Sequence, residues 1–338
     1  MYELRKADKE LIVQWDELVF SLPGGTIFHS LEWLDLLGKN QGLDIQHIGI
    51  FLNGKIVGIF PLCVNHLFFM NVAGSPYVVE DTYYMGPAID SAHIYELLPA
   101  INQYMKNQKI HYLRLMSNQH LGMEGTIAGY DFINKHTHIL DITQTYEKLW
   151  QGLEDRCRDH IRRAKKSGIV VQLETNRDFI DSYYSLIEHV YHSQGMPCPN
   201  RKNFYLDMRD RFGGENALFL SARYKGELIA GVIIIVDRTC AYYLNGASKH
   251  DFRSLAPNNL LLWEACRITK ELGAEKFDFV GSDIPRLSEF KKSFGGELIT
   301  HSLIEKAGSK WVGFLREKYP VYRKAIGNIR EKFKWGKD

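Results

Sequence analysis

The sequence predicts an α+β protein made of two copies of one unit, each a mixed, mainly antiparallel sheet flanked by helices. Its 338 residues suit about two domains of roughly 150 residues. The chain is 45% hydrophobic and 24% charged, which is typical of a soluble globular protein and argues against a disordered, collagen-like or membrane-spanning one. The third observation is that one pattern of strands, turn and helix occurs twice.

Each copy of the pattern opens with two β-rich runs joined by a two-residue turn. The runs cover residues 44–51 and 55–64 in the first copy, and residues 217–224 and 227–236 in the second. The turns are Asn53-Gly54 and Lys225-Gly226. Asn-Gly is the strongest short hairpin signal, because both residues must take positive φ. We therefore expect an antiparallel hairpin in each half.

A third strand, a helix and a fourth strand follow in each copy. The third strands are expected at residues 83–86 and 242–246, the helices at 96–107 and 257–272, and the last strands at 111–116 and 276–280. Because a helix connects the last two strands, they must pair in parallel. Pro99 should kink the first helix or mark a later start, whereas Pro257 and Gly273 suit the two ends of the second. The better-formed second copy is the expected place for chemistry.

These repeats predict two domains, residues 1–143 and 144–311, with the second carrying the active site. The basic tail 312–338 has a helical apolar face, and we expect it to dock on the first domain; contact with a membrane or RNA is the alternative. The N-terminus lacks a signal-peptide pattern, and the apolar run at 228–236 is too short to span a membrane. The five cysteines form no CxxC pair, so they are expected to be reduced thiols in a cytoplasmic protein.

The segment 285–296, PRLSEFKKSFGG, holds the main catalytic candidate. Leu287, Phe290 and Phe294 have helical spacing and should bury one helix face, which places Lys291 beside that face. A solvated lysine is the alternative. Before this helix, the strand at 276–280 ends in Gly281-Ser282, where open α/β sheets bind ligands beyond their strand ends. An ordinary turn is the alternative there.

Four stretches carry a resemblance to a known family. They are HSLEWLDLL at 29–37, RCRDHIRRAKKSGIVV at 156–171, APNNLLLWEACRITKELGAEKFDFVGS at 256–282, and EFKKSFGGEL at 289–298. They resemble the FemABX-like branch of the GNAT acyltransferase superfamily, the FemAB-related aminoacyltransferases of peptidoglycan bridges, whose members carry two GNAT-like domains. The resemblance implies an enzyme that moves an amino acid from aminoacyl-tRNA to an amine on a peptidoglycan precursor.

The resemblance also implies roles for individual residues. Lys291, in the family's Phe-Lys-x-x-Phe-Gly motif, would stabilise the oxyanion, with Phe290 beside it at the substrate. Tyr243 lies in the strand whose GNAT counterpart opens to admit the acyl donor, and Asn258 opens the following helix. Arg201 lies in a loop, 196–205, that resembles one entering the acceptor site. We assign these residues, with Gly281 and Ser282, to substrate binding.

A basic stretch at residues 156–166 carries six positive residues against one negative, Asp159. On a helix, the apolar residues form one stripe: Leu149, Leu153, Cys157, Ile161 and Ala164. Arg158, Arg162, Lys165 and Lys166 share a different face, and the hypothesis is that they bind phosphates of the tRNA acceptor stem. A solvated linker helix is the alternative.

The acyl donor is the main open choice. GNAT enzymes grip coenzyme A with a glycine-rich loop, but residues 247–259 contain no glycine. Aminoacyl-tRNA is therefore favoured and no cofactor is expected, although Lys249 and Arg253 leave acetyl- or acyl-coenzyme A as an alternative donor. A second alternative is a non-catalytic GNAT-like module that binds RNA or a partner.

Two features bear on the acceptor and on metal binding. Where peptidoglycan-modifying members often carry a lysine after the tryptophan of HSLEWLDLL, this chain has Leu36 and Leu37, and Lys39 is the nearest candidate. The acceptor is therefore an amine on a small molecule or an envelope precursor, not necessarily a cell-wall one. His136 and His138 alternate along a strand without a further ligand nearby, so they are interpreted as structural, and no metal is expected.

Overall fold

The computed structural model describes residues 1–67, 69–77 and 81–318. It separates into two compact units, Met1–Lys135 with Thr300–Asp338, and His136–Ile299. The chain passes from one unit to the other within β7 (Tyr130–Asp141) and returns within β13 (Glu297–Ala307). The predicted boundaries at 143/144 and 311/312 lie 8 and 12 residues beyond the divisions at 135/136 and 299/300.

Unit 1 is a sheet with the strand order β1-β2-β3-β4-β5-β13, and β6 pairs with the first part of β7. Its strands are β1 (Tyr2–Lys6), β2 (Asp44–Leu52), β3 (Lys55–Leu67), β4 (Met70–Ser75), β5 (Ile110–Met116) and β6 (Gly125–Ile127). Its helices are α1 (Lys9–Val13), α2 (Trp15–Ser21), α3 (Leu31–Gln41) and α4 (Ile94–Asn107). The predicted hairpin is present, with Asn53 and Gly54 at φ 50° and 80° between β2 and β3.

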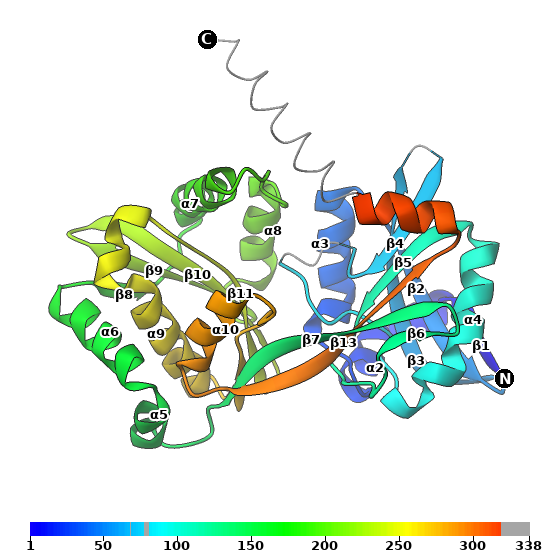
Figure 1. Cartoon of the computed structure of the whole chain (residues 1–338), viewed down its shortest axis with the longest axis horizontal. Helices are drawn as coiled ribbons and strands as arrows, with labels where there is room; N and C mark the ends of the chain where they lie inside the picture. Colours follow the sequence, from blue (N-terminus) through cyan, green and yellow to red (C-terminus); the bar gives the residue numbers. More distant parts are fainter. Residues whose placement is uncertain (68, 78–80, 319–338) are drawn as a thin grey trace, which may run out of the picture. The chain divides into compact units, whose positions relative to one another are not determined.

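Helices cover both faces of this sheet (Figure 1). Ile48 and Ile50 of β2 pack in the core that contains Leu97 of α4. On the alternate positions of β2, the His47 ring contacts Trp15 of α2 edge-on at 5.0 Å, and a Cβ on Gly49 would meet Leu11. Successive side chains of a strand point to opposite faces, so β2 is covered on both.

Two expectations for unit 1 are wrong in detail. Residues 83–86 form no strand, and Tyr84 has φ 50°; the third strand is β4, which precedes them. Helix α4 begins at Ile94 and continues through Pro99, so the proline does not mark a later start. The order itself is confirmed, because β4 pairs in parallel with β5 after the α4 crossover.

Unit 2 repeats this plan with the strand order β7-β12-β11-β10-β9-β8. Its other strands are β8 (Val170–Leu173), β9 (Ala217–Tyr224), β10 (Glu227–Asp237), β11 (Cys240–Ser248) and β12 (Lys276–Asp278). Its helices are α5 (Tyr146–Gly152), α6 (Asp155–Lys166), α7 (Phe179–Ser193), α8 (Lys202–Phe212), α9 (Pro257–Glu271) and α10 (Pro285–Lys292). Lys225 and Gly226, at φ 51° and 83°, form the second predicted turn.

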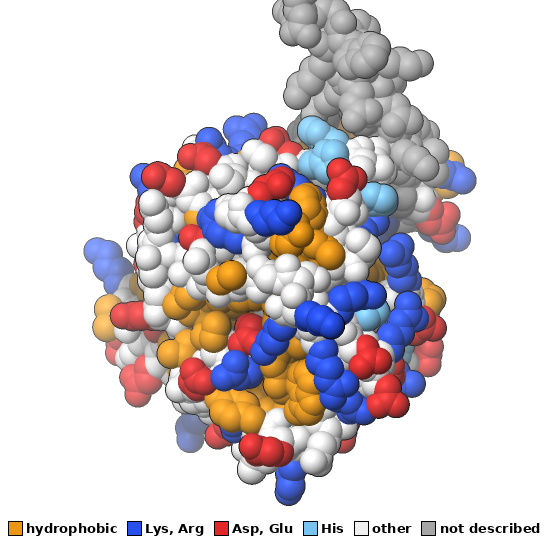
Figure 2. Space-filling model, turned by 90° about the vertical axis from the view of Figure 1, so that its left-hand side faces the viewer, with side chains coloured by type: hydrophobic (Ala, Val, Ile, Leu, Met, Phe, Trp, Pro, Cys, Tyr) orange, Lys and Arg blue, Asp and Glu red, His pale blue; other side chains and the backbone are white. Residues whose placement is uncertain are grey.

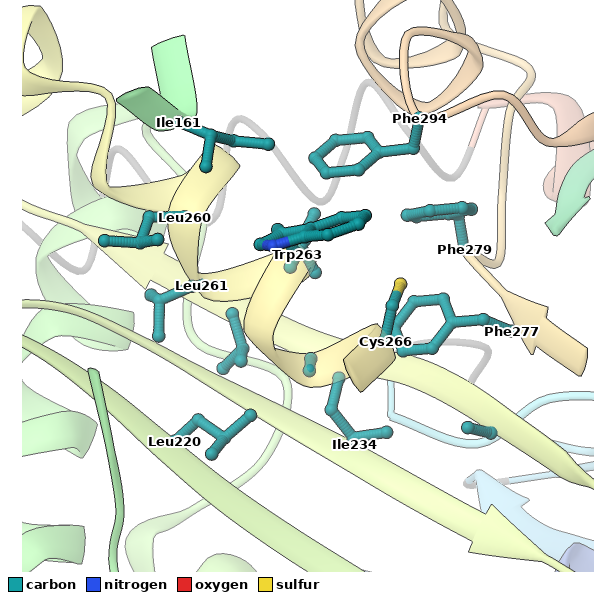
Figure 3. Packing of buried hydrophobic residues seen from close by; sticks show 14 of the residues in the cluster. Ile161, Leu220, Ile234, Leu260, Leu261, Trp263, Cys266, Phe277, Phe279 and Phe294 are labelled. Atoms are coloured by element: carbon teal, nitrogen blue, oxygen red, sulfur yellow. The ribbon is translucent and has the colours of Figure 1, made fainter. Parts of the chain in front are cut away.

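The core of unit 2 lies between α6, α9 and one face of the sheet (Figure 3). Trp263 of α9 is surrounded there by aliphatic side chains and by a row of phenylalanines. Phe277 contacts Phe279 with ring centroids 4.9 Å apart, and Phe279 contacts Phe294 at 5.2 Å. This row fixes the end of β12 against the segment that follows α10.

The amphipathic pattern of the basic segment is confirmed with one correction. Leu149, Leu153, Cys157 and Ile161 are buried in the unit 2 core, as the stripe predicts. The stripe spans two helices, however, because α5 ends at Gly152 and Leu153 is its extended C-cap.

The start of the tail packs on unit 1. Residues 310–318 are helical, Val312 is buried, and Arg316 donates to the Tyr112 hydroxyl at 2.9 Å and to Glu305 at 3.1 Å. This agrees with the predicted docking for the described part. The remainder of the predicted tail, 319–338, lies outside the described residues.

Candidate active site

The chain makes a tight turn directly after β12. Val280 has φ 48° and Gly281 has φ 62°, so two consecutive residues are left-handed. A β-branched residue rarely takes this conformation, and its presence here needs fixed neighbours. The Asp278 carboxylate supplies one, because it accepts the Val280 N–H at 2.8 Å and also the Thr137 hydroxyl of β7.

Lys291 of α10 reaches into this turn. Its ammonium donates to the main-chain carbonyls of both Val280 and Gly281. The side chain is buried, with the residue 7% exposed, and Nζ lies 6.0 Å from the ring centroid of Tyr243 in β11. Two of the three N–H groups are thereby satisfied, and among the described residues the third has no hydrogen-bond partner, so it can serve a ligand.

Burial lowers the pKa of Lys291 from 10.5 to about 8, and the nearby carboxylates of Asp278 and Asp283 oppose part of that change. An ammonium out of water is costly, whereas a neighbouring negative charge favours it. Near neutral pH the group is still mainly charged. A lysine poised in this way suits a site where negative charge develops.

Two phenylalanines hold the helix that carries Lys291. Phe290 contacts Phe294 edge-on at 5.4 Å, and Phe294 is fully buried in the unit 2 core. Gly295 follows at φ 83°, where an added Cβ would lie 2.7 Å from the Gly152 carbonyl oxygen. The prediction that Leu287 is buried on the same face is wrong, because this residue is 43% exposed.

The sheet opens beside Lys291. Strand β11 pairs with β12 only through Cys240, Ala241 and Tyr242, whereas β11 continues to Ser248 along β10. The ladder between β10 and β11 shifts register between Ile233 and Ile234, so Leu244 bulges from β11. In the described part of the chain, residues 243–248 therefore have strand pairing on one side only, and Tyr243 begins this opening.

The structure brings together several of the predicted substrate-binding residues. Tyr243 and Gly281 contact Lys291, and Phe290 precedes it in α10. Ser282 follows Gly281 in the chain. Asn258 lies in the first turn of α9 and donates to the Ser248 hydroxyl at 3.2 Å, at the far end of the opening.

Arg201 lies apart from this group. It is the N-cap residue of α8 and its side chain is exposed. Within the described residues, it shares no hydrogen bond, ion pair or ring contact with Lys291. Its assignment to an acceptor phosphate or carboxylate stays a prediction.

Three of the four predicted phosphate-binding residues on α6 have partners within the protein. Arg158 donates to the carbonyl of Gln151 at 2.9 Å, and to those of Trp150 and Leu153, at the end of α5. Arg162 pairs with Asp159 at 3.0 Å, and Lys165 pairs with Glu264 at 2.9 Å. Lys166 is exposed.

The charges on this face are mixed. Figure 2 shows Lys and Arg side chains interspersed with Asp and Glu, and not one continuous basic surface. Binding of tRNA phosphates at α6 stays a prediction.

Sequence reasoning interpreted two polar residues beside Lys291, His138 and Asp278, as structural and did not predict their partners. Nδ1 of His138 lies 2.9 Å from the Ser282 hydroxyl, and the His138 residue is 2% exposed. Asp278 fixes the turn that holds the lysine. The alternating histidines of β7 were visible in the sequence, but their partners lie more than 140 residues away and no local pattern reveals them.

Comparisons with known proteins agree with this fold. Residues 153–292, all in unit 2, match the family model of an acetyltransferase (GNAT) domain. Among solved structures, FemX has a TM-score of 0.67 at 15% identity, over 90% of this chain and 97% of FemX. A tandem GNAT protein from the clavulanic acid biosynthesis pathway has a TM-score of 0.55 at 12% identity, over 90% of this chain and 98% of that one. The solved structures show a tandem GNAT fold, and the matched acetyltransferase domain supports an acyltransferase.

A curated relative refines this class. The chain is 22% identical to the lipid II:glycine glycyltransferase of Staphylococcus epidermidis, across 80% of this chain and 83% of the relative. It is thus a homologue of a Fem-type glycyltransferase, and the resemblance to the FemABX-like branch is confirmed. The relative and the matched domain support the hypothesis of an enzyme over that of a non-catalytic binding module.

Neither a membrane span nor a metal centre is found in the described ranges. No helix there is long and apolar enough to cross a bilayer. No group of three or more His, Cys, Asp or Glu side chains in the same ranges could hold a metal ion.

Proposed function

We propose that this protein transfers an amino acid from aminoacyl-tRNA to an amine of a cell-envelope precursor, forming an amide. The observation that carries the proposal is the buried Lys291 ammonium, held by two carbonyls where β11 leaves β12. The relative that acts on lipid II and glycine supports the acceptor class. We place the reaction in the cytoplasm, where charged tRNA is available.

The residues at the opening suggest how the transfer proceeds. The acceptor amine attacks the acyl carbonyl carbon, and the carbonyl oxygen becomes an oxyanion. The remaining N–H of Lys291 donates to that oxygen, in a site where burial strengthens the interaction. When the tetrahedral intermediate collapses, the leaving ester oxygen takes a proton and the amide remains. Because an aminoacyl ester is already activated, positioning and oxyanion charge suffice.

The loop after β11 supports an ester donor over coenzyme A. Residues 250–255 form a short 3₁₀ helix, Ala256 has φ 56°, and α9 begins at Pro257, which lacks an N–H. A pyrophosphate needs free main-chain amides at that turn. Lys249, one of two side chains that could replace them, pairs with Glu227 at 2.5 Å.

Coenzyme A stays the second candidate donor, because the matched family model is that of an acetyltransferase domain. Thermal-shift measurements separate the two donors. We expect a non-hydrolysable aminoacyl-tRNA analogue to raise the Tm and acetyl-coenzyme A to leave it unchanged. A large shift with acetyl-coenzyme A and none with the tRNA analogue would refute the proposed donor.

Activity tests the role of Lys291. Transfer of radiolabelled glycine from glycyl-tRNA to lipid II in detergent micelles should fall by roughly 10²- to 10³-fold in Lys291→Ala, the range for losing one oxyanion donor. Lys292→Ala is the matched control, because Lys292 is the next residue of α10 and is exposed. Full activity of the Lys291 variant, with the fold intact, would exclude the proposed role.

A further inference from the structure

A buried histidine and serine form a hydrogen-bonded pair beside Lys291. Nδ1 of His138 lies 2.9 Å from Oγ of Ser282. The two residues are 2% and 5% exposed. Ser282 directly follows Gly281, whose carbonyl accepts from Lys291, so the pair adjoins the candidate site without being used by the mechanism above.

The main chain fixes this pair in place. The Phe279 N–H donates to the His138 carbonyl at 2.9 Å, and the Ser282 N–H donates to the His136 carbonyl at 2.6 Å. The turn after β12 therefore runs along β7, and the Ser282 hydroxyl meets the imidazole with both backbones held. Because the main chain of both residues is held by hydrogen bonds, the pair loses little conformational freedom when a substrate binds beside it.

The two histidines of β7 face different surroundings. Nδ1 of His136 is 3.3 Å from the Asp283 carboxylate, with both side chains more than one-third exposed. His138 instead has the neutral Ser282 hydroxyl as its partner. Two residues apart on one strand, they provide a functional candidate and a matched control.

The charges around His138 keep its imidazole neutral at neutral pH. Burial lowers its pKa, and the positive charges of Lys291 and Lys292 on α10 lower it further. Asp278 on β12 and Asp283 after it are the acidic groups of the same turn; Asp278 is engaged by Thr137 and Val280, and Asp283 by His136. An unprotonated imidazole can accept a proton, which an imidazolium cannot.

We propose that Ser282 and His138 together accept the proton that the acceptor amine loses during acyl transfer. The attacking nitrogen becomes positively charged when its bond to the acyl carbon forms. Its proton passes to the Ser282 oxygen while the Ser282 hydroxyl proton passes to Nδ1 of His138. Lys291 gives a proton to the leaving ester oxygen as the C–O bond breaks, and the imidazolium returns its proton to the lysine through solvent. The sum is amine plus ester giving amide plus alcohol.

The inference rests on the proposed function, because it uses the site around Lys291. It also gives a reason for placing a cation beside a histidine: burial lowers the pKa of His138 most, and the Lys291 charge that lowers it further is the one that holds the oxyanion. When His138 has become an imidazolium, the Lys291 ammonium repels it. Transfer of the Lys291 proton to the leaving group removes this repulsion. Each proton movement thus favours the other.

Kinetics of three variants test the pair. We expect His138→Gln and Ser282→Ala to lower kcat of glycine transfer by about 10²-fold or more, the range for a general base. His136→Gln should stay within a few-fold of wild type. The acid limb of the pH profile of kcat should disappear in His138→Gln, and added imidazole should restore part of the activity. A purely structural histidine would give neither the lost limb nor the rescue.

The outcomes separate this inference from the proposed function. If Lys291→Ala abolishes transfer while His138→Gln and Ser282→Ala remain fully active, only the proton relay is wrong. If Lys291→Ala is also fully active, the proposed site itself fails. Circular dichroism of each variant shows whether it is folded. If His138→Gln does not fold, Ser282→Ala still tests the pair, because it removes only one oxygen atom.

A measurement without turnover gives a second test. Nitrogen-15 NMR of histidine-labelled protein reports the protonation of His138 directly. We expect Lys291→Met to raise the His138 pKa, because it removes one of the positive charges that lower it. An unchanged His138 pKa would show that the two groups are not coupled and would overturn the relay.

Discussion

The buried charge of Lys291 makes a quantitative prediction about stability and pH. The folded-state pKa of about 8, against 10.5 for a free lysine, corresponds to roughly 3 kcal/mol that burial costs the ammonium. Between pH 8 and 10.5 the unfolded chain binds more protons than the folded one, so the free energy of unfolding rises with pH. Below pH 8 the full cost is present.

Lys291→Met removes this titration and keeps most of the side-chain volume. At pH 7 the variant loses the cost of the buried charge but leaves the carbonyls of Val280 and Gly281 without their donor. Each such loss costs about 1–3 kcal/mol, so the two effects largely offset at that pH. At pH 10 the wild-type lysine is mostly neutral and no longer bears the cost of a buried charge. Relative to wild type, the variant should therefore be ~2 kcal/mol less stable at pH 10 than it is at pH 7.

Urea titrations at pH 7 and pH 10 measure this difference. Unfolding of unit 2 is followed by pulsed hydrogen exchange of peptides from α9, because two units need not unfold together. Lys292→Met, the exposed neighbour, should change stability equally at both values of pH. If the free energies of unfolding of wild type and Lys291→Met differ by the same amount at pH 7 and at pH 10, the pKa of the buried lysine is not lowered and this reasoning is wrong.

Three further substitutions test particular contacts. Gly281→Ala should destabilise unit 2 by about 1 kcal/mol in urea, because the left-handed backbone at φ 62° penalises a side chain although no atom lies within 4 Å. Phe294→Ala should cost about 3–5 kcal/mol of unit 2 stability, since this ring is fully buried in the core. Arg316→Met should cost unit 1 about 1–3 kcal/mol through its lost bonds to Tyr112 and Glu305, measured by exchange of β5 peptides.

Local sequence signals predicted both hairpins correctly. Where local signals gave a wrong element, pairing with neighbouring strands determined the structure. Asn53-Gly54 and Lys225-Gly226 specify positive φ by residue type, and both turns are present. The third strand of unit 1 was misplaced because Tyr83 and Tyr84 have high β-propensity, whereas β4 (MNVAGS) is short and contains glycine. Pairing with β3 and β5, not propensity, makes β4 a strand.

The site was predicted in part for a similar reason. Lys291 could be found because the spacing of Phe290 and Phe294 is a property of one helix. The partner of His138 could not, because Ser282 is 144 residues away in the chain. Arg158 shows the same limit: helical spacing placed it on a shared basic face, and the carbonyls at the end of α5, which accept from its guanidinium, were not predicted. Spacing identifies a face and not the neighbour that meets it.

The two units also differ in a way that supports placing the proposed chemistry in the second. In unit 1, β4 pairs in parallel with β5 up to Ser75, the last residue of β4. In unit 2, the equivalent strand β11 continues for six residues past Tyr242, its last pair with β12. Only a sheet that separates in this way leaves main-chain groups free to receive an acyl chain. The first copy keeps the strand order but closes the opening, so its sheet can serve structure while the second retains the space, the lysine and the turn that holds it.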